Sequence, residues 1–214
     1  MIMYMFFRKL VEIWFKHIKY KMTVLNPENI PAQNGGFIVA SNHLTYSDPP
    51  VIAAVFKGRF SFMAKSELFK NKIFAWIITK CGAFPVVRGA KDNTAIERAV
   101  SDIEKNKIFV IFPEGTRSKD GVIARAKSGV ALIAGMANAP VVPVSIMYGC
   151  DGKRRTCAVA VGEMIPTEEI AITDVTDRKR IKAVSSLVMS SICALQRQIC
   201  EHYHIPVPGS EGLL

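Results

Sequence analysis

The sequence predicts an α/β fold, in which a mainly parallel sheet is flanked by helices. Short apolar runs bounded by turn-forming residues alternate along the chain with longer segments of helical periodicity. Strands separated by helices imply parallel pairing, because each helix returns the chain to the same edge of the sheet. The 214 residues, 50% of them hydrophobic and 21% charged, exclude a disordered chain and can bury one core. No internal repeat or linker divides them.

The expected elements follow from the local pattern of each segment. A buried strand at 37–41 follows a Gly-Gly pair, and the next helix opens at Asp48, which can cap it, with Pro49 in the first turn. The clearest buried strand is KIFVIF at 107–112. A long C-terminal helix over roughly 176–203 is marked by apolar residues at three- and four-residue steps. The other expected strands are 60–64, 83–87, 141–146 and 156–162, and the other expected helices are 70–82, 92–105 and 127–138.

Residues 1–22 predict an amphipathic helix of the kind that lies in a membrane interface. Charged side chains, mostly basic, recur on one stripe, while apolar side chains that include Trp14 and Phe15 fall on the other side. A secretory signal is not indicated, because its positive charges would precede the apolar run and a small-residue cleavage site would follow it. A first helix that packs on the core is the open alternative. We therefore expect an interfacial helix and connector at 1–30 and one folded domain at 31–214.

The charge balance points to an acidic partner. Lys and Arg number 28 against 18 Asp and Glu, and the net charge of +10 suits nucleic acid, anionic lipid or a phosphorylated small molecule. Five cysteines without a C-x-x-C pair indicate reduced thiols rather than disulfides or zinc ligands. A mean hydropathy of +0.21 favours an apolar substrate or contact with an apolar surface. With the interfacial helix, these features predict a peripheral or monotopic protein on the cytoplasmic face of the cell membrane.

The first candidate site is the loop NHLTYSD at 42–48. His43 and Asp48 are five residues apart, so on a helix they would differ by about 140° and on a strand they would lie roughly 16 Å apart. Only a turn that returns the chain can bring the imidazole and the carboxylate together. A carboxylate bonded to one ring nitrogen would leave the other nitrogen as a base. The plainer interpretation makes Asp48 a helix cap and His43 a solvated loop residue.

The second candidate site is the loop FPEGTRS at 112–118, which follows the clearest strand. Gly115 allows a positive φ or a close backbone approach, and Arg117 offers a planar fork for phosphate or carboxylate. The spacing is not that of a P-loop. An ordinary turn with a Glu–Arg surface pair would explain this loop equally well.

Cations at neighbouring strand ends strengthen the case for a shared site. Lys65 follows the strand at 60–64, and Arg88 follows the strand at 83–87. Because parallel strands end at one edge of a sheet, both would approach His43 and Arg117. A phosphate-bearing substrate beside a catalytic base would need this combination.

Five blocks resemble, in their order, those of the lysophosphatidic acid (1-acylglycerol-3-phosphate) acyltransferase family. They are NHLTYSD, AKSEL, GAFPVVR, FPEGTRS and VVPVS, and they span about residues 37–146. The H-x-x-x-x-D and FPEGTRS blocks together are highly specific. The resemblance implies that 31–214 is an acyltransferase domain. It also implies acyl transfer from acyl-CoA or acyl carrier protein to the free hydroxyl of 1-acylglycerol-3-phosphate, which forms phosphatidic acid in phospholipid biosynthesis.

The same resemblance assigns roles to individual residues. His43 is the general base and Asp48 orients it. The acceptor phosphate would be bound by residues of the GAFPVVR and FPEGTRS blocks, which the AKSEL lysine is expected to join: Lys65, Arg88, Glu114, Gly115, Thr116 and Arg117. VVPVS is less specific and would lie near the acyl site.

Acyl transfer to a lipid hydroxyl also suits the chemical properties of these residues, independently of the resemblance. A lipid hydroxyl is a poor nucleophile until a base removes its proton during attack on the thioester. No G-x-S-x-G elbow is present and no cysteine lies in the blocks, so direct transfer is favoured over an acyl-enzyme. No metal or cofactor is expected beyond the acyl thioester.

Three alternative functions remain open, in order of increasing difference from this one. An enzyme of the same family could acylate another lysolipid, such as a lyso-ornithine lipid or a lysophospholipid. A thioesterase could use the His43–Asp48 pair to activate water. A basic binding module would leave both loops without purpose and lacks base-stacking aromatics among its basic runs, so nucleic acid is not an expected partner.

Overall fold

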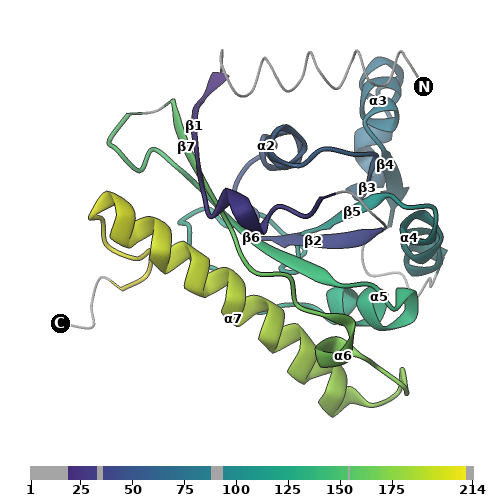
Figure 1. Cartoon of the computed structure of the whole chain (residues 1–214). Helices are drawn as coiled ribbons and strands as arrows, with labels where there is room; N and C mark the ends of the chain where they lie inside the picture. The colour runs from purple at the N-terminus through teal and green to yellow at the C-terminus, as the bar shows by residue number, and fades with distance from the viewer. Residues whose placement is uncertain (1–18, 33–35, 88–93, 154, 211–214) are drawn as a thin grey trace.

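The computed structural model describes residues 19–32, 36–87, 94–153 and 155–210, and places seven strands in one sheet (Figure 1). The strands are β1 Lys21–Leu25, β2 Phe37–Ser41, β3 Phe60–Lys65, β4 Ala83–Val86, β5 Ile108–Ile111, β6 Val141–Tyr148 and β7 Thr156–Val161. The helices are α2 Asp48–Val55, α3 Lys72–Lys80, α4 Thr94–Glu104, α5 Gly129–Ala137, α6 Thr167–Ile170 and α7 Arg178–Tyr203, with 3-10 turns η2 Pro27–Asn29 and η3 Ser66–Phe69. The strand order is β1-β7-β6-β2-β5-β3-β4, and only the β6–β7 pair is antiparallel. The predicted mainly parallel α/β fold is confirmed.

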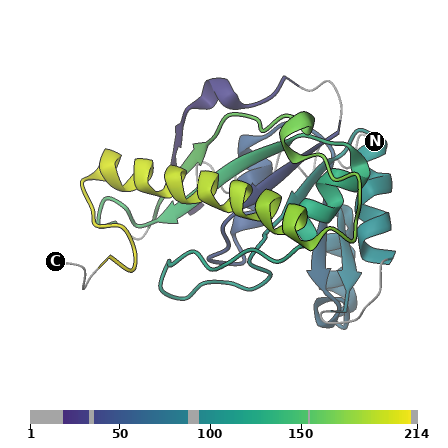
Figure 2. The ribbon, with the colours of Figure 1, turned by 90° about the horizontal axis from the view of Figure 1, so that it is seen from below.

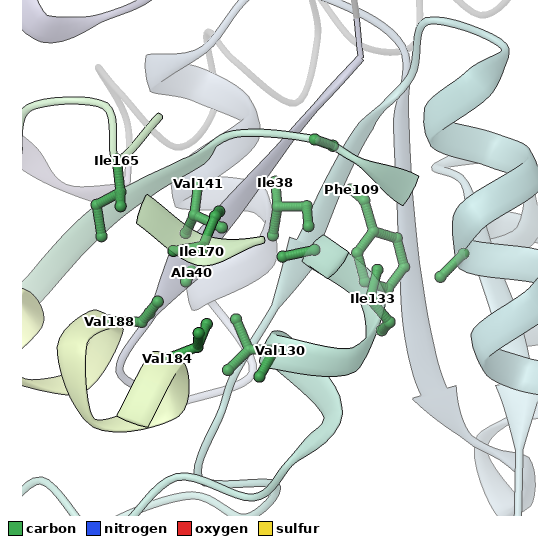
Figure 3. Packing of buried hydrophobic residues seen from close by; sticks show 14 of the residues in the cluster. Ile38, Ala40, Phe109, Val130, Ile133, Val141, Ile165, Ile170, Val184 and Val188 are labelled. Atoms are coloured by element: carbon green, nitrogen blue, oxygen red, sulfur yellow. The ribbon is translucent and has the colours of Figure 1, made fainter. Parts of the chain in front are cut away.

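The two faces of the sheet pack against different helices, because side chains alternate along each strand. Ile38 and Ala40 of β2 join the cluster that contains residues of α4, α5 and α7 (Figure 3). Phe37 and Val39 of the same strand join the opposite cluster, with residues of α2. Seen from below, α7 crosses the sheet at full length (Figure 2). A sheet covered in this way reads as continuous apolar runs, which is why the strands were visible in the sequence.

The chain reverses its direction of winding between β2 and β5, which are hydrogen-bonded neighbours. The connection that leaves β2 passes through α2 on one face, and the connection that leaves β5 passes through α5 on the other. The loops after these strands therefore part to opposite sides of the sheet. This is the topological switch point at which open α/β sheets bind ligands, and both candidate loops begin there.

The N-terminal boundary expected from the sequence needs correction. The interfacial helix was expected to reach residue 22 and its connector residue 30, but Lys21–Leu25 forms β1 and pairs in parallel with β7. The edge of β7 supplies the hydrogen bonds that make this short segment a strand. Residues 21–30 therefore belong to the folded domain. Residues 1–18, which carry most of the expected helix, lie outside the described residues.

A buried ion cluster joins α4 to the sheet. Asp102, only 2% exposed, accepts hydrogen bonds from Ser61 Oγ at 2.6 Å, Lys107 Nζ at 2.6 Å and Arg98 Nε at 3.2 Å. Burial acts to raise the pKa of Asp102, but the bonds from Lys107, Ser61 and Arg98 outweigh it and lower the pKa. The carboxylate is therefore held ionised as a structural group.

Within the described part of the chain, no helix has both the length and the apolar character needed to span a bilayer.

Candidate active site

The first motif forms the turn between β2 and α2, and its start is anchored inside the protein. Asn42 is fully buried, and its side-chain amide donates to the carbonyl of Ile146 and accepts from the N–H of the same residue, at 2.9 and 2.8 Å. This pair of bonds fixes the end of β2 to β6. His43 therefore leaves the sheet from a rigid position.

The turn brings His43 and Asp48 into direct contact. Nδ1 of His43 lies 2.6 Å from Oδ2 of Asp48, whose side chain is fully buried. A carboxylate at this distance accepts the Nδ1 proton and leaves the lone pair on Nε2. No group in the described residues bonds to Nε2, and the His43 side chain is 14% exposed. The structure thus contains the contact that the family resemblance implies, and this arrangement would allow Nε2 to accept a proton.

The carboxylate of Asp48 is saturated with donors. Oδ2 also accepts the backbone N–H groups of Leu44 and Thr45, at 2.6 and 2.8 Å. Oδ1 accepts the hydroxyls of Thr45 at 3.1 Å and Tyr148 at 2.7 Å. Burial, followed by the charge of Asp48, raises the pKa of Tyr148 above its usual range, so its hydroxyl stays protonated and donates. Asp48 is thus held in one orientation.

The second motif lies against the first. The His43 ring stacks on Phe112, with 4.1 Å between ring centroids, and the His43 carbonyl accepts the N–H of Ser118 at 2.8 Å. Glu114, 4% exposed, accepts the N–H of His43 at 3.0 Å on one oxygen and the N–H of Ala124 at 3.0 Å on the other. Both of its oxygens are therefore bonded inside the protein rather than open to an acceptor phosphate.

Cationic side chains rim the second motif. The guanidinium carbon of Arg117 lies 3.8 Å from the ring centroid of Tyr46, in the loop that carries His43. Among the described residues no carboxylate pairs with Arg117. Gly115 has φ 72°, and a Cβ there would lie 2.9 Å from Nζ of Lys127, so the lysine passes directly over the glycine. Gly115 thus serves both as a left-handed turn and as a place for a cation to cross.

The remaining residues expected to bind the acceptor phosphate are Lys65, Thr116 and Arg88, and each has a different environment or status from Arg117. Lys65 is at the C-terminal end of β3, but its Nζ pairs with Glu67 at 2.9 Å, and both side chains are half exposed. The hydrogen bond from Lys65 lowers the pKa of Glu67 to about 2. Thr116 is exposed beside Arg117. Arg88 lies outside the described residues.

The family assignment rests on a match across most of this sheet. A family model described as Acyltransferase matches residues 21–147, from the first residue of β1 into β6. The chain belongs to the acyltransferase family. This confirms the resemblance carried by the motifs.

Two curated relatives are similar to this chain over most of its length. A 1-acyl-sn-glycerol-3-phosphate acyltransferase of Streptococcus pneumoniae is 37% identical over 144 residues, which are 66% of this chain and 53% of that protein. The Bacillus subtilis protein of the same name is 29% identical over 82% of this chain and 88% of its own length. The match to the pneumococcal relative therefore spans about half of that relative's length.

The fold also has a solved counterpart. The crystal structure of the 1-acyl-sn-glycerophosphate (LPA) acyltransferase PlsC from Thermotoga maritima superposes with a TM-score of 0.71 at 24% identity. The superposition covers 93% of this chain and 79% of that one. It shows that the two chains share their architecture.

Several residues that shape this site were not foreseen from the sequence. Tyr148 and Asn42 act through contacts that span about a hundred positions of the chain, and no local pattern marks them. There was only a weak indication in the sequence for Lys127, which lies two residues before α5 on the loop after β5. The five cysteines are free thiols, as expected, and burial raises the pKa of each one.

Proposed function

We propose that this protein transfers a fatty acyl group from an acyl thioester to the free hydroxyl of 1-acylglycerol-3-phosphate, which forms phosphatidic acid. The observation that carries the proposal is the His43–Asp48 contact, which lies at the switch point and against a cationic loop. The names of the pneumococcal and Bacillus relatives support this acceptor.

The reaction follows from the free nitrogen of His43. Nε2 accepts the proton of the acceptor hydroxyl as the oxygen attacks the thioester carbonyl, and Asp48 stabilises the resulting imidazolium. The attack forms the ester C–O bond and a tetrahedral intermediate, and collapse of this intermediate restores the carbonyl and breaks the C–S bond. The imidazolium then returns its proton to the departing sulfur, which leaves as the free thiol of CoA or acyl carrier protein.

The cations place the acceptor rather than act on the thioester. Arg117 presents a planar fork for a phosphate, and its contact with Tyr46 holds that fork beside the loop of His43. Lys127 adds a second positive charge above Gly115. An acceptor held by its phosphate would then offer its hydroxyl to Nε2.

A second class of acceptor, the lyso-ornithine lipids, is supported by the name of another relative. A lyso-ornithine lipid O-acyltransferase of Pseudomonas aeruginosa is 28% identical over 125 residues, which are 58% of this chain and 47% of that protein. A lyso-ornithine lipid carries no phosphate, so the exposed fork of Arg117 favours the phosphate-bearing acceptor.

A panel of acceptors tests the proposal. Purified protein is incubated with acyl-CoA or acyl carrier protein and with 1-acylglycerol-3-phosphate, lyso-ornithine lipid or a lysophospholipid, and free thiol and lipid product are both measured. We expect thiol release that depends on the phosphate acceptor and equals phosphatidic acid formed. Thiol released without acceptor would indicate a thioesterase, and a preference for another lysolipid would reassign the acceptor. The two donor arms decide which carrier is used.

We also propose that residues 1–18 attach the protein to the cytoplasmic face of the cell membrane. Their basic and aromatic side chains suit an anionic interface. Deletion should stop at residue 18, because Lys21–Leu25 is a strand of the sheet. The shortened protein should keep its fold and acylate a detergent-dispersed acceptor, but bind vesicles less tightly. Unchanged vesicle binding would remove the role of residues 1–18.

A further inference from the structure

Helix α3 leaves its large apolar side chains in solvent. Ile73 is 75% exposed, Trp76 54% and Phe74 42%, and no residue of α3 is buried. The other large helices of the domain, α4, α5 and α7, each bury several residues in the core. Contiguous apolar surface of this kind marks a site of contact with another molecule or with a membrane.

The apolar residues of α3 share one side of the helix with basic residues. Ile73, Trp76 and Ile77 are three and four positions apart, so they are neighbours on one side. Lys72 and Lys80 lie one turn before and one turn after Trp76. The helix contains no acidic residue.

The segment that leads into α3 adds to its positive charge. Between positions 65 and 80 there are four lysines and one glutamate, Glu67, which is paired with Lys65. The four lysines are all exposed: Lys65, Lys70, Lys72 and Lys80. The surface therefore combines exposed aromatic side chains with a local excess of positive charge.

The position of α3 relates this surface to the candidate site. The chain leaves the C-terminal end of β3, passes through η3 and enters α3 before it returns to β4 at the outer edge of the sheet. The first turn of α3 is therefore nearest the edge that carries His43 and Arg117. In Figure 1, α3 stands at the opposite end of the sheet from β1 and β7.

We propose that α3 is a membrane-contact surface, in which Trp76 and Ile73 enter the lipid interface and the lysines face anionic headgroups. Aromatic side chains bordered by lysines suit this boundary, because the rings bury apolar area while the ammonium groups stay in water. The positive charge complements an anionic bilayer. This contact is additional to the attachment proposed for residues 1–18, and its test does not use the acylation reaction.

Tryptophan fluorescence provides a direct test, because the chain has two tryptophans. In the full chain carrying Trp14→Phe, all tryptophan emission comes from Trp76. Vesicles of phosphatidylglycerol and phosphatidylcholine should shift this emission to shorter wavelength and protect it from acrylamide, and acyl-brominated lipids should quench it. Protein that sediments with the vesicles while Trp76 stays water-exposed would overturn the proposal.

Paired substitutions measure the strength of the contact. Ile73→Ser with Trp76→Ser should weaken sedimentation with the same vesicles by about tenfold or more, since two large apolar groups no longer leave water. The matched control is Met136→Ser with Val175→Ser, which changes side chains that are 47% and 53% exposed outside α3. Circular dichroism confirms that both proteins are folded. Equal binding by the two proteins would contradict the proposal.

Two other occupants give distinct results. A shift of Trp76 emission with acidic acyl carrier protein, but not with vesicles, would make α3 a protein-docking surface. A shift that depends only on protein concentration would indicate self-association through α3. Either outcome overturns the membrane contact, and neither bears on whether the protein acylates its acceptor.

Discussion

The buried carboxylate of Glu114 accepts the backbone N–H of His43, with 3.0 Å between the atoms. The second bond of Glu114, to Ala124, ties this pair to the loop that continues toward α5. The only acidic side chain of the FPEGTRS motif therefore holds the loop that carries His43 in place. This contact explains how a carboxylate can stand in a motif expected to bind phosphate.

Replacing Glu114 with Gln should separate the positioning role from the phosphate-binding role. The amide group would meet one of the two N–H donors without a hydrogen bond, at a cost of about 1–3 kcal/mol in folding free energy. A displaced His43 should lower kcat by about tenfold or more while the acceptor KM changes little. Steady-state kinetics and urea unfolding measure both effects. A lower acceptor KM at unchanged kcat would instead mean that Glu114 repels a bound phosphate.

Loss of the base should abolish most of the transfer. His43→Ala should reduce kcat/KM by about 10²–10⁴-fold, and Asp48→Asn should impair it severely, because the orienting carboxylate is gone. His202→Ala is the matched control, since His202 is exposed on α7, and it should keep the wild-type rate. Folded His43→Ala that retains more than about a tenth of the rate would remove the base assignment.

The hydroxyl of Tyr148 should help to hold Asp48 in the orientation that His43 requires. In Tyr148→Phe, Oδ1 of Asp48 loses its donor at 2.7 Å, so the carboxylate is held by fewer bonds and orients the His43 ring less well. As a result, kcat should fall by about tenfold while the acceptor KM changes little. A purely structural role would lower stability without lowering kcat. Steady-state kinetics and a thermal unfolding curve distinguish the two.

Arg117→Lys should act on the acceptor alone. Lysine keeps the charge but loses the planar fork and its stacking on Tyr46, so the acceptor KM should rise while the donor KM changes little. Arg178→Lys, at an exposed position of α7, is the control. A change confined to the donor KM would move Arg117 to the phosphates of the acyl carrier.

Acid should weaken the fold through Asp102. Its pKa in the folded protein lies below the ordinary value of 3.8, so the carboxylate stabilises the fold above about pH 4 and this contribution fades as pH falls through the lowered pKa. Asp102→Asn should cost about 3 kcal/mol at neutral pH, because Lys107 loses its buried partner, and should flatten the acid dependence. Urea unfolding at pH 7 and at pH 3 measures this. Exposed Glu163→Gln should change neither value, and an unaltered acid dependence in Asp102→Asn would assign it to other carboxylates.

The sequence was most informative where local pattern alone determines structure. The strand Phe37–Ser41 has its expected bounds, and the long helix begins two residues from its expected start, because both bury continuous apolar faces. The spacing of His43 and Asp48 left open whether they meet, and the resemblance of NHLTYSD to a family block favoured the contact that the structure shows.

Features that depend on distant partners were missed for a physical reason. The segment Lys21–Leu25 is a strand only because β7 offers it an edge. Glu114 looks the same in sequence whether its carboxylate faces a ligand or the N–H of a neighbouring loop. Tyr148 reaches Asp48 only after β6 has been placed beside β2.

The edge strand β1 also sets where the N-terminal segment leaves the domain. Just before β1, Nζ of Lys19 and the hydroxyl of Tyr20 bond to Ser47 Oγ, at 2.8 and 3.1 Å, and Ser47 precedes Asp48 in the chain. An anchor formed by residues 1–18 would therefore join the domain directly beside the His43–Asp48 pair, with no flexible linker between them. The height of His43 above the lipid headgroups would then be fixed, because the strand β1 rather than a flexible linker would determine it. Inserting a flexible spacer after residue 18 would let that height vary without altering a single residue of the active site.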